Sequence, residues 1–162
     1  MVNLMHKYLI RPARLADVPA MAGLAAEFAE YMRRLGDETE FHLDAEALER
    51  DGFGPTPAFA GFVAEITNEI VGYVLFHDGY DTDAAHRVVF VVDLMVTQTM
   101  RGKGVGAALM REVSSVAAGR RAKQLVWTVD RRNAEAIRFY ERVGGQLVNN
   151  LYLMCLDVEQ HN

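Results

Sequence analysis

The sequence predicts a mixed α/β fold in which a mostly antiparallel central sheet of six or seven strands carries about four helices on its two faces. Three observations lead to this prediction. Apolar segments joined by tight turns in the first half of the chain indicate hairpins, and hence antiparallel pairing. A strand, a helix and a further strand over residues 88–129 indicate a parallel crossover. Amphipathic helices lie around these segments, so both faces of the sheet are expected to be covered.

Several segments have the length and composition of strands. They are short apolar runs, rich in β-branched and aromatic side chains and bounded by turn residues. A tight turn at Asn68–Glu69 joins the second to the third, a polar loop over 78–83 precedes the fourth, and Asn149–Asn150 separates the two that close the sheet. The expected strands are residues 8–11, 59–66, 70–77, 88–96, 124–129, 146–148 and 151–156.

Helices are expected between these strands. Apolar side chains recur at steps of three and four over residues 18–35, where Asp17 can cap the helix and Pro19 lies in its first turn. A short helix over 44–50 should lead into a loop over 51–57. Two more helices follow the fourth and fifth strands and belong to the motifs described below.

The composition is that of one globular domain, which is expected to span residues 1–162. Of the 162 residues, 51% are hydrophobic and 24% are charged, so the chain can bury a sizeable core. Its formal net charge of −5 argues against a general nucleic-acid binder and is compatible with a cationic substrate. No apolar run reaches the roughly 18 residues that a membrane span needs.

A cytoplasmic location is expected, because residues 1–7 lack the architecture of a signal peptide. The single cysteine, Cys155, excludes an intrachain disulfide and suits a reducing compartment; we expect it to be a small apolar residue in the last strand. The five histidines show no ligand spacing with cysteine or carboxylates, so no metal site is expected.

The most informative segment is Arg101-Gly102-Lys103-Gly104-Val105-Gly106-Ala107, between an apolar strand and a helix. Glycine lets the backbone approach a ligand, and a helix N-terminus presents unpaired N–H groups and a partial positive charge. Together they predict a site for phosphate or pyrophosphate. The alternative, a glycine-rich turn that binds no ligand, would not explain the basic residues Arg101 and Lys103.

Two other kinds of phosphate-binding loop are alternatives for this segment. The segment 102–107 also fits the dinucleotide pattern G-x-G-x-x-G/A, and Asp130 ends the next strand. Its late place in the chain, the meander-like strands before it and the two basic side chains, which would crowd a pyrophosphate turn, argue against that pattern. A Walker-type loop fails because no Gly-Lys-Ser/Thr follows.

Arg101-x-x-Gly104-x-Gly106 resembles the acetyl-CoA motif of the GNAT superfamily of N-acetyltransferases. Residues 133–145, an asparagine-capped helix with a tyrosine and two closing glycines, resemble its second signature. The likeness covers nearly the whole chain and implies an N-acetyltransferase that uses acetyl-CoA and forms a homodimer, often through its C-terminal strands. The segments most similar to the diamine (spermidine/spermine) branch are 51–54, 62–65, 80–82 and 93–96.

The resemblance also implies how the donor is held. Backbone N–H groups of the glycine loop would hold the pyrophosphate, and the strand before it would pair with the pantetheine arm. A bulge in that strand would free an N–H for the thioester oxygen. The implied donor-binding residues are Leu94, Met95, Val96, Arg101, Gly102, Lys103, Gly104, Val105, Gly106, Ala107, Asn133, Ala136 and Tyr140.

Tyr140 is the candidate general acid, because a phenol pKa of about 10 keeps it protonated at neutral pH. A core tyrosine is the alternative. The base is open. Asp93 could act through water or brace a loop, since Val92 stands where the diamine branch has a glutamate. His77, with an ordinary pKa of about 6.5, could serve or be a solvated surface histidine. A water chain could also suffice.

Two departures from the diamine branch concern the acceptor. Tyr31-Met32 stands where that branch has a tyrosine-glutamate pair facing the polyamine, and Val92 replaces a second acid. Two charge contacts, each worth roughly 1.5–3 kcal/mol, are thus lost. We therefore predict a less cationic primary amine, such as an amino acid or amine-bearing metabolite, that attacks acetyl-CoA directly in a ternary complex near Tyr31, Met32, Val92 and His77. A protein or peptide acetyltransferase and a CoA-binding module without catalysis stay open as alternatives.

Overall fold

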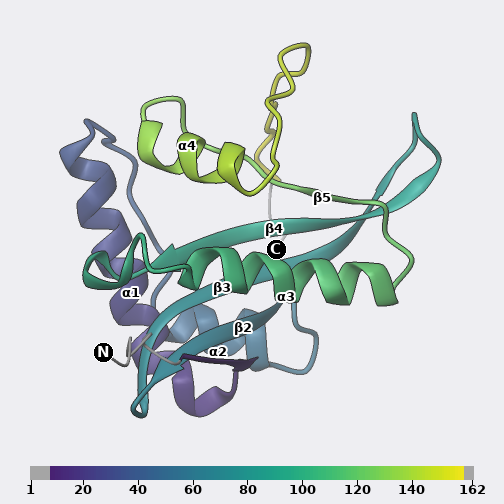
Figure 1. The fold of residues 1–162 in the computed structure, drawn as a ribbon. Coiled ribbons are helices and arrows are strands. Elements are labelled where there is room, and N and C mark those ends of the chain that lie inside the picture. The colour runs from purple at the N-terminus through teal and green to yellow at the C-terminus, as the bar shows by residue number, and fades with distance from the viewer. Residues whose placement is uncertain (1–7, 159–162) are drawn as a thin grey trace, which may run out of the picture.

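Five strands form one sheet in the order β1-β2-β3-β4-β5, antiparallel except for the parallel pair β4 and β5 (Figure 1). This is a computed structural model, and it describes residues 8–158. The predicted mixed α/β fold is confirmed. Its elements are β1 (Leu9–Pro12), η1 (Leu15–Asp17), α1 (Val18–Arg34), α2 (Ala45–Phe53), β2 (Ala60–Ile66), β3 (Glu69–Asp81), β4 (His86–Val96), η2 (Gln98–Met100), α3 (Val105–Gly119), β5 (Gln124–Val126) and α4 (Ala134–Arg142).

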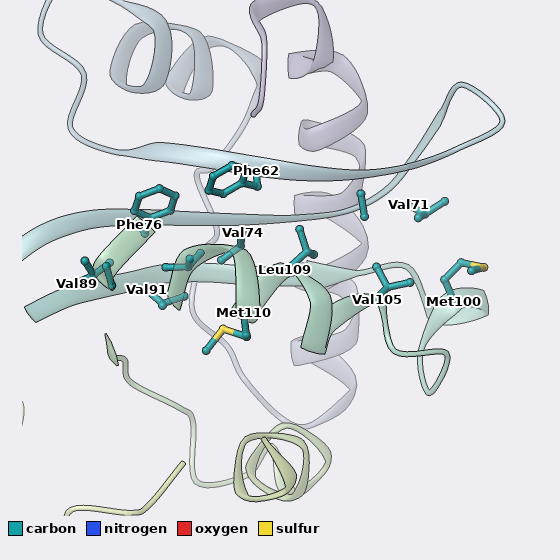
Figure 2. Close-up of a cluster of buried hydrophobic side chains, with 13 residues drawn as sticks. Phe62, Val71, Val74, Phe76, Val89, Val91, Met100, Val105, Leu109 and Met110 are labelled. Carbon is teal, nitrogen blue, oxygen red and sulfur yellow. The ribbon is translucent and has the colours of Figure 1, made fainter. Parts of the chain in front are cut away.

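Helices cover both faces of the sheet, as predicted. Helix α3 lies across one face, and α1 and α2 lie on the other (Figure 1). Because side chains alternate along a strand, Val74 and Phe76 point to α3, whereas Tyr73 and Leu75 point to α1 and α2. Figure 2 shows the first of the two resulting cores, in which aliphatic side chains of α3 such as Leu109 meet apolar side chains of the sheet.

The strand β4 contains the bulge that the family resemblance implied. On β3, Leu75 and Phe76 are consecutive, but their partners on β4 are Asp93 and Val91. Val92 is therefore an extra residue that shifts the alternation of β4 by one position.

Local element boundaries differ from the prediction at several places. Strand β3 continues to Asp81 through most of the predicted loop over 78–83, and β5 ends at Val126 instead of residue 129. Helix α2 continues to Phe53 instead of ending near Arg50, and Asp44 caps it by accepting the Ala47 N–H at 2.8 Å. The hairpin between β2 and β3 turns at Thr67 and Asn68, with φ of 49° and 63°, so Glu69 already belongs to β3. A two-residue turn with both φ values positive matches the twist of the strands it joins.

The two strands predicted near the C-terminus are wrong: residues 146–148 and 151–156 form no strand, so the sheet has five strands instead of six or seven. This segment extends away from the sheet (Figure 1). Its side chains have strand-forming character, but β-propensity produces a strand only where a neighbour supplies the ladder. Cys155 is consequently exposed instead of lying in a last strand.

The N-terminal part is joined to the sheet by a partly buried ion pair. The Asp17 carboxylate accepts two hydrogen bonds from the Arg11 guanidinium, at 2.7 and 2.8 Å, and one from the Arg14 N–H at 2.8 Å. Arg11 also donates to Glu65 on β2 at 2.7 Å. Asp17 does precede α1, but its side chain binds Arg11 instead of capping that helix as predicted. Hydrogen bonding from Arg11 holds the pKa of Asp17 below its usual value.

Among residues 8–158, no helix combines the length and the apolar character that a membrane crossing requires. Residues 1–7, for which the sequence predicted no signal peptide, lie outside the described part of the chain.

The ion pair predicts a stability loss in Asp17→Asn. Glu65 remains as a partner of Arg11, so we expect the free energy of unfolding at pH 7 to fall by about 2–3 kcal/mol, somewhat less than for a fully orphaned buried charge. Because folding lowers the pKa of Asp17, the stabilisation is present above the unfolded pKa and is lost as the pH falls through the folded one. The difference from wild type should shrink below about pH 4.

Denaturant unfolding at neutral and acidic pH measures both effects. Asp51→Asn is the matched control, because Asp51 forms an exposed pair with Arg50 and should matter little. Equal losses in the two variants would contradict the role assigned to the Arg11–Asp17 pair.

Candidate active site

The site begins where β4 and β5 separate. The two strands pair over three residues only, 88–90 with 124–126. Beyond Phe90, β4 continues to Val96, and in the described part of the chain β3 is its one paired neighbour there. The resulting edge of β4 lies inside the fold, because Leu94, Met95 and Val96 line a cavity.

This cavity has a volume of about 400 Å³, within the usual range for small-molecule sites. Its walls come from β4, the turn before α3, the C-terminal half of α1, and α4. It brings together most of the donor-binding residues predicted from the sequence. Those that line it, with Tyr31, are Leu94, Met95, Val96, Arg101, Gly102, Gly104, Gly106, Ala107, Asn133, Ala136 and Tyr140.

The turn before α3 has the backbone that its glycines predict. Gly102 and Gly104 have φ of 72° and 84°, in the left-handed region that favours glycine. Gly104 is the N-cap of α3, so the first N–H groups of the helix have no partner within it. A Cβ on Gly106 would lie 3.1 Å from the Phe139 ring, a tight contact, so glycine lets α4 approach closely. With Arg101 beside it, this turn has the features of a phosphate site.

Arg101 joins three elements beside the cavity. Its Nε donates to the Val96 carbonyl oxygen at 3.0 Å, and its guanidinium carbon lies 4.8 Å from the centroid of the Tyr31 ring. Its Nη1 lies 3.6 Å from Glu135 Oε2. The cation is thus fixed by β4, α1 and α4 at the phosphate-binding end.

Asn133 caps α4, as predicted, and is buried. Its Oδ1 accepts hydrogen bonds from the Ala136 N–H at 3.0 Å and the Tyr31 hydroxyl at 3.1 Å. Its Nδ2 donates to the Met32 sulfur at 3.8 Å. Met32, only 3% exposed, therefore supports Asn133 from α1. Burial and the charge of Glu135 raise the pKa of Tyr31.

Tyr140 also lines the cavity and belongs to an aromatic group. Its ring centroid is 4.9 Å from that of Trp127 and 5.1 Å from that of Phe139. Burial and the negative charge of Asp93 raise the pKa of Tyr140 to about 12. Its phenol is protonated at neutral pH and can donate a proton or hydrogen bond.

Asp93 follows the bulge and is partly buried. Its Oδ2 accepts a hydrogen bond from the Tyr73 hydroxyl at 2.5 Å. Burial raises the pKa of this carboxyl, and the hydrogen bond from Tyr73 opposes the rise. The Asp93 carboxyl and the protonated Tyr140 phenol thus act on one another beside the cavity wall, an arrangement suited to acid–base chemistry.

Comparison with protein families matches residues 23–145 to the acetyltransferase (GNAT) family, over more than half of the chain. The protein belongs to the GNAT family. It is an acyltransferase, and its relatives place it in the diamine acetyltransferase branch.

The thialysine N-epsilon-acetyltransferase of Bos taurus is 33% identical over 146 residues, covering 85% of this chain and 84% of that protein. The spermidine/spermine N(1)-acetyltransferase-like protein 1 of Homo sapiens is 30% identical over 147 residues, which are 86% of this chain and 21% of that protein. The crystal structure of a ribosomal-protein-alanine N-acetyltransferase from Brucella melitensis biovar Abortus 2308 has the same fold, with a TM-score of 0.72 and 24% identity over 93% of this chain and all of that one.

Other residues predicted for the GNAT site lie outside the cavity lining. His77 is exposed, with its ring stacked on Phe90 at 5.3 Å and its Nδ1 2.9 Å from the Asp78 carbonyl oxygen. Val92 is 45% exposed. The full set outside the lining is Met32, His77, Val92, Asp93, Lys103 and Val105.

The cavity also has wall residues that the sequence analysis missed. Glu135 and Phe139 flank predicted positions on α4, so the helical period could have indicated them. Phe28 precedes Tyr31 by three residues on α1 and could have been found in the same way. Tyr73, which does not line the cavity, carried no such signal, because it reaches Asp93 only as a diagonal neighbour across the β3–β4 pair. Among residues 8–158, no three His, Cys, Asp or Glu side chains are grouped so that they could hold a metal ion.

Proposed function

We propose that this GNAT domain transfers the acetyl group of acetyl-CoA to a primary amine of a small molecule, by direct attack in a ternary complex. One observation carries the proposal: a single cavity connects the glycine-rich N-terminus of α3 with Tyr140, along a free edge of β4. A donor with a phosphate at one end and a reactive acyl group at the other suits such a site.

The residues present fit acetyl-CoA. Arg101 and the backbone N–H groups around Gly104 would bind the pyrophosphate. The amide groups of the pantetheine arm would pair with the unpaired edge of β4 at residues 94–96, as a further strand does. Asn133 would contact the same arm from α4. This arrangement would place the thioester near Tyr140.

The reaction then needs two proton movements. The amine nitrogen attacks the thioester carbon, the new C–N bond forms and the C–S bond breaks. An N–H group freed by the bulge at Val92 would stabilise the negative charge on the carbonyl oxygen. The amine loses its proton to Asp93, directly or through water, and the departing thiolate takes a proton from Tyr140.

The acceptor we propose is the side-chain amine of a small amino acid. The bovine relative is named for acetylating the Nε of thialysine, a compound of this kind. A long polyamine would need further anionic partners, and Met32 and Val92 supply none. The acidic net charge of −5 still favours a cationic amine over an acidic compound.

A turnover screen tests this function. With acetyl-CoA as donor and thiol release as the signal, we expect thialysine or L-ornithine to exceed spermidine in kcat/KM at least tenfold, the effect of losing one charged contact. Spermidine as the best acceptor would overturn the proposed acceptor class. Tight acetyl-CoA binding without turnover on any amine would indicate a binding module, and turnover on lysine peptides alone would indicate a protein acetyltransferase.

Tyr140→Phe tests the general acid. The ring packing against Trp127 is retained while the proton is lost, so we expect kcat to fall by about 10²–10⁴-fold, the usual contribution of such a group. The Kd for acetyl-CoA should change little. Tyr80→Phe is the control, because Tyr80 is 62% exposed on the distal part of β3. An unchanged kcat would assign Tyr140 to the aromatic packing alone.

We also propose that the protein is a homodimer that buries its C-terminal segment, residues 146–158. Apolar side chains from Leu147 to Val158 are 57–91% exposed, more contiguous apolar surface than a monomer usually shows. Sedimentation velocity should find a dimer at micromolar concentration and a monomer for Leu153→Asp. Leu15→Asp, at an exposed leucine elsewhere, should remain dimeric. A monomeric wild type would refute this assembly.

A further inference from the structure

The pair formed by the buried Tyr73 and the partly buried Asp93 has a geometry that folding alone does not require. Tyr73 is completely buried, and its hydroxyl donates to Asp93 Oδ2 at 2.5 Å. Phenylalanine would fill the same apolar core without a polar atom to satisfy. The Tyr73 hydroxyl is therefore explained by its hydrogen bond to Asp93.

The bulge at Val92 brings the two residues together. Val91 packs in the core under α3, and an unbroken strand would point Asp93, two residues on, to the same face. The extra residue instead turns Asp93 to the face where Tyr73 lies among side chains of α1 and β3. The feature that would free the oxyanion-binding N–H thus also sets the direction of the carboxylate.

Few groups act on this carboxylate. Burial favours its neutral form, and hydrogen bonds from the Tyr73 hydroxyl on β3 and from the Leu94 N–H favour its charged form. Tyr140 on α4 is the other titratable group that feels its charge. Side chains of α1 packed around Tyr73, including Met21 and Leu24, are apolar. Burial and Asp93 together raise the pKa of Tyr73 well above the ordinary value, so its hydroxyl is always a donor.

We propose that Tyr73 is a positioning residue for acetyl transfer: its hydroxyl keeps Asp93 ionised and turned so that the carboxylate can take the proton of the attacking amine. Tyr73 reaches neither substrate. This inference rests on the proposed function, in which Asp93 is the proton acceptor.

Tyr73→Phe removes the hydroxyl and little else. Without that hydrogen bond, only the Leu94 N–H is left to oppose the effect of burial, so the pKa of Asp93 should rise. We expect the acid limb of kcat/KM to move upward by about one to two pH units, the effect of one hydrogen bond to a charged group. Two acceptor amines of different basicity separate this limb from the titration of the amine itself. The KM for acetyl-CoA should stay within a few-fold of wild type.

Tyr80→Phe on the same strand is the matched control and should keep the wild-type profile. An acid limb that does not move in a folded Tyr73→Phe protein would overturn the inference, because a purely structural tyrosine would change stability alone. If the variant does not fold, carbon-13 NMR of the Asp93 carboxyl in the wild-type protein decides. A titration of Asp93 that coincides with the acid limb supports the proposal, and one that departs from it refutes it. Absence of acetylation by the wild type counts against the proposed function instead.

Discussion

The arrangement of the whole site depends on one constraint, the early end of the pairing between β4 and β5. Three paired residues hold the parallel strands together, and past Phe90 the backbone of β4 loses its neighbour on that side. Backbone N–H and C=O groups inside a fold need partners. A free strand edge that faces a cavity can therefore bind an extended ligand whose amide groups pair with the strand. The glycine turn, the N-terminus of α3 and the aromatic side chains of α4 are placed around this edge.

Helix α4 closes the cavity without a conventional packed face, since none of its residues is fully buried. It is held at its N-terminus by Tyr31 and the cap Asn133, and along its length by Phe139 and Tyr140. The same side chains line the cavity. An occupant of the cavity would therefore contact the groups that fix α4, which links donor binding to the placement of Tyr140.

Features that depend on backbone conformation were predictable from the sequence. The glycine turn and the Asn133 cap require particular residues at particular spacings, and both are found where predicted. The C-terminal strands were not, because strand character in residues 151–156 says nothing about whether a neighbouring edge exists. The Asp17 cap failed for a related reason: Arg11, six residues earlier, competes for the carboxylate with a stronger charge-assisted bond. Each miss was decided by a partner, or the lack of one, outside the local sequence pattern.

The proposed donor and acceptor sites differ in the same way in how far the sequence predicts them. In the proposed function, donor recognition would use backbone groups, namely N–H groups, a helix terminus and a strand edge, so a motif is enough to reveal it. Acceptor recognition would use side chains that α1, β3 and β4 bring together, and one position cannot be judged without the others. Val92 illustrates this: taken alone, it removes an acid, but as the bulge residue it also turns Asp93 toward Tyr73. The loss of one carboxylate and the orientation of the next are consequences of the same residue, so the chemistry of the proposed amine site would depend on the bulge rather than on any single charge.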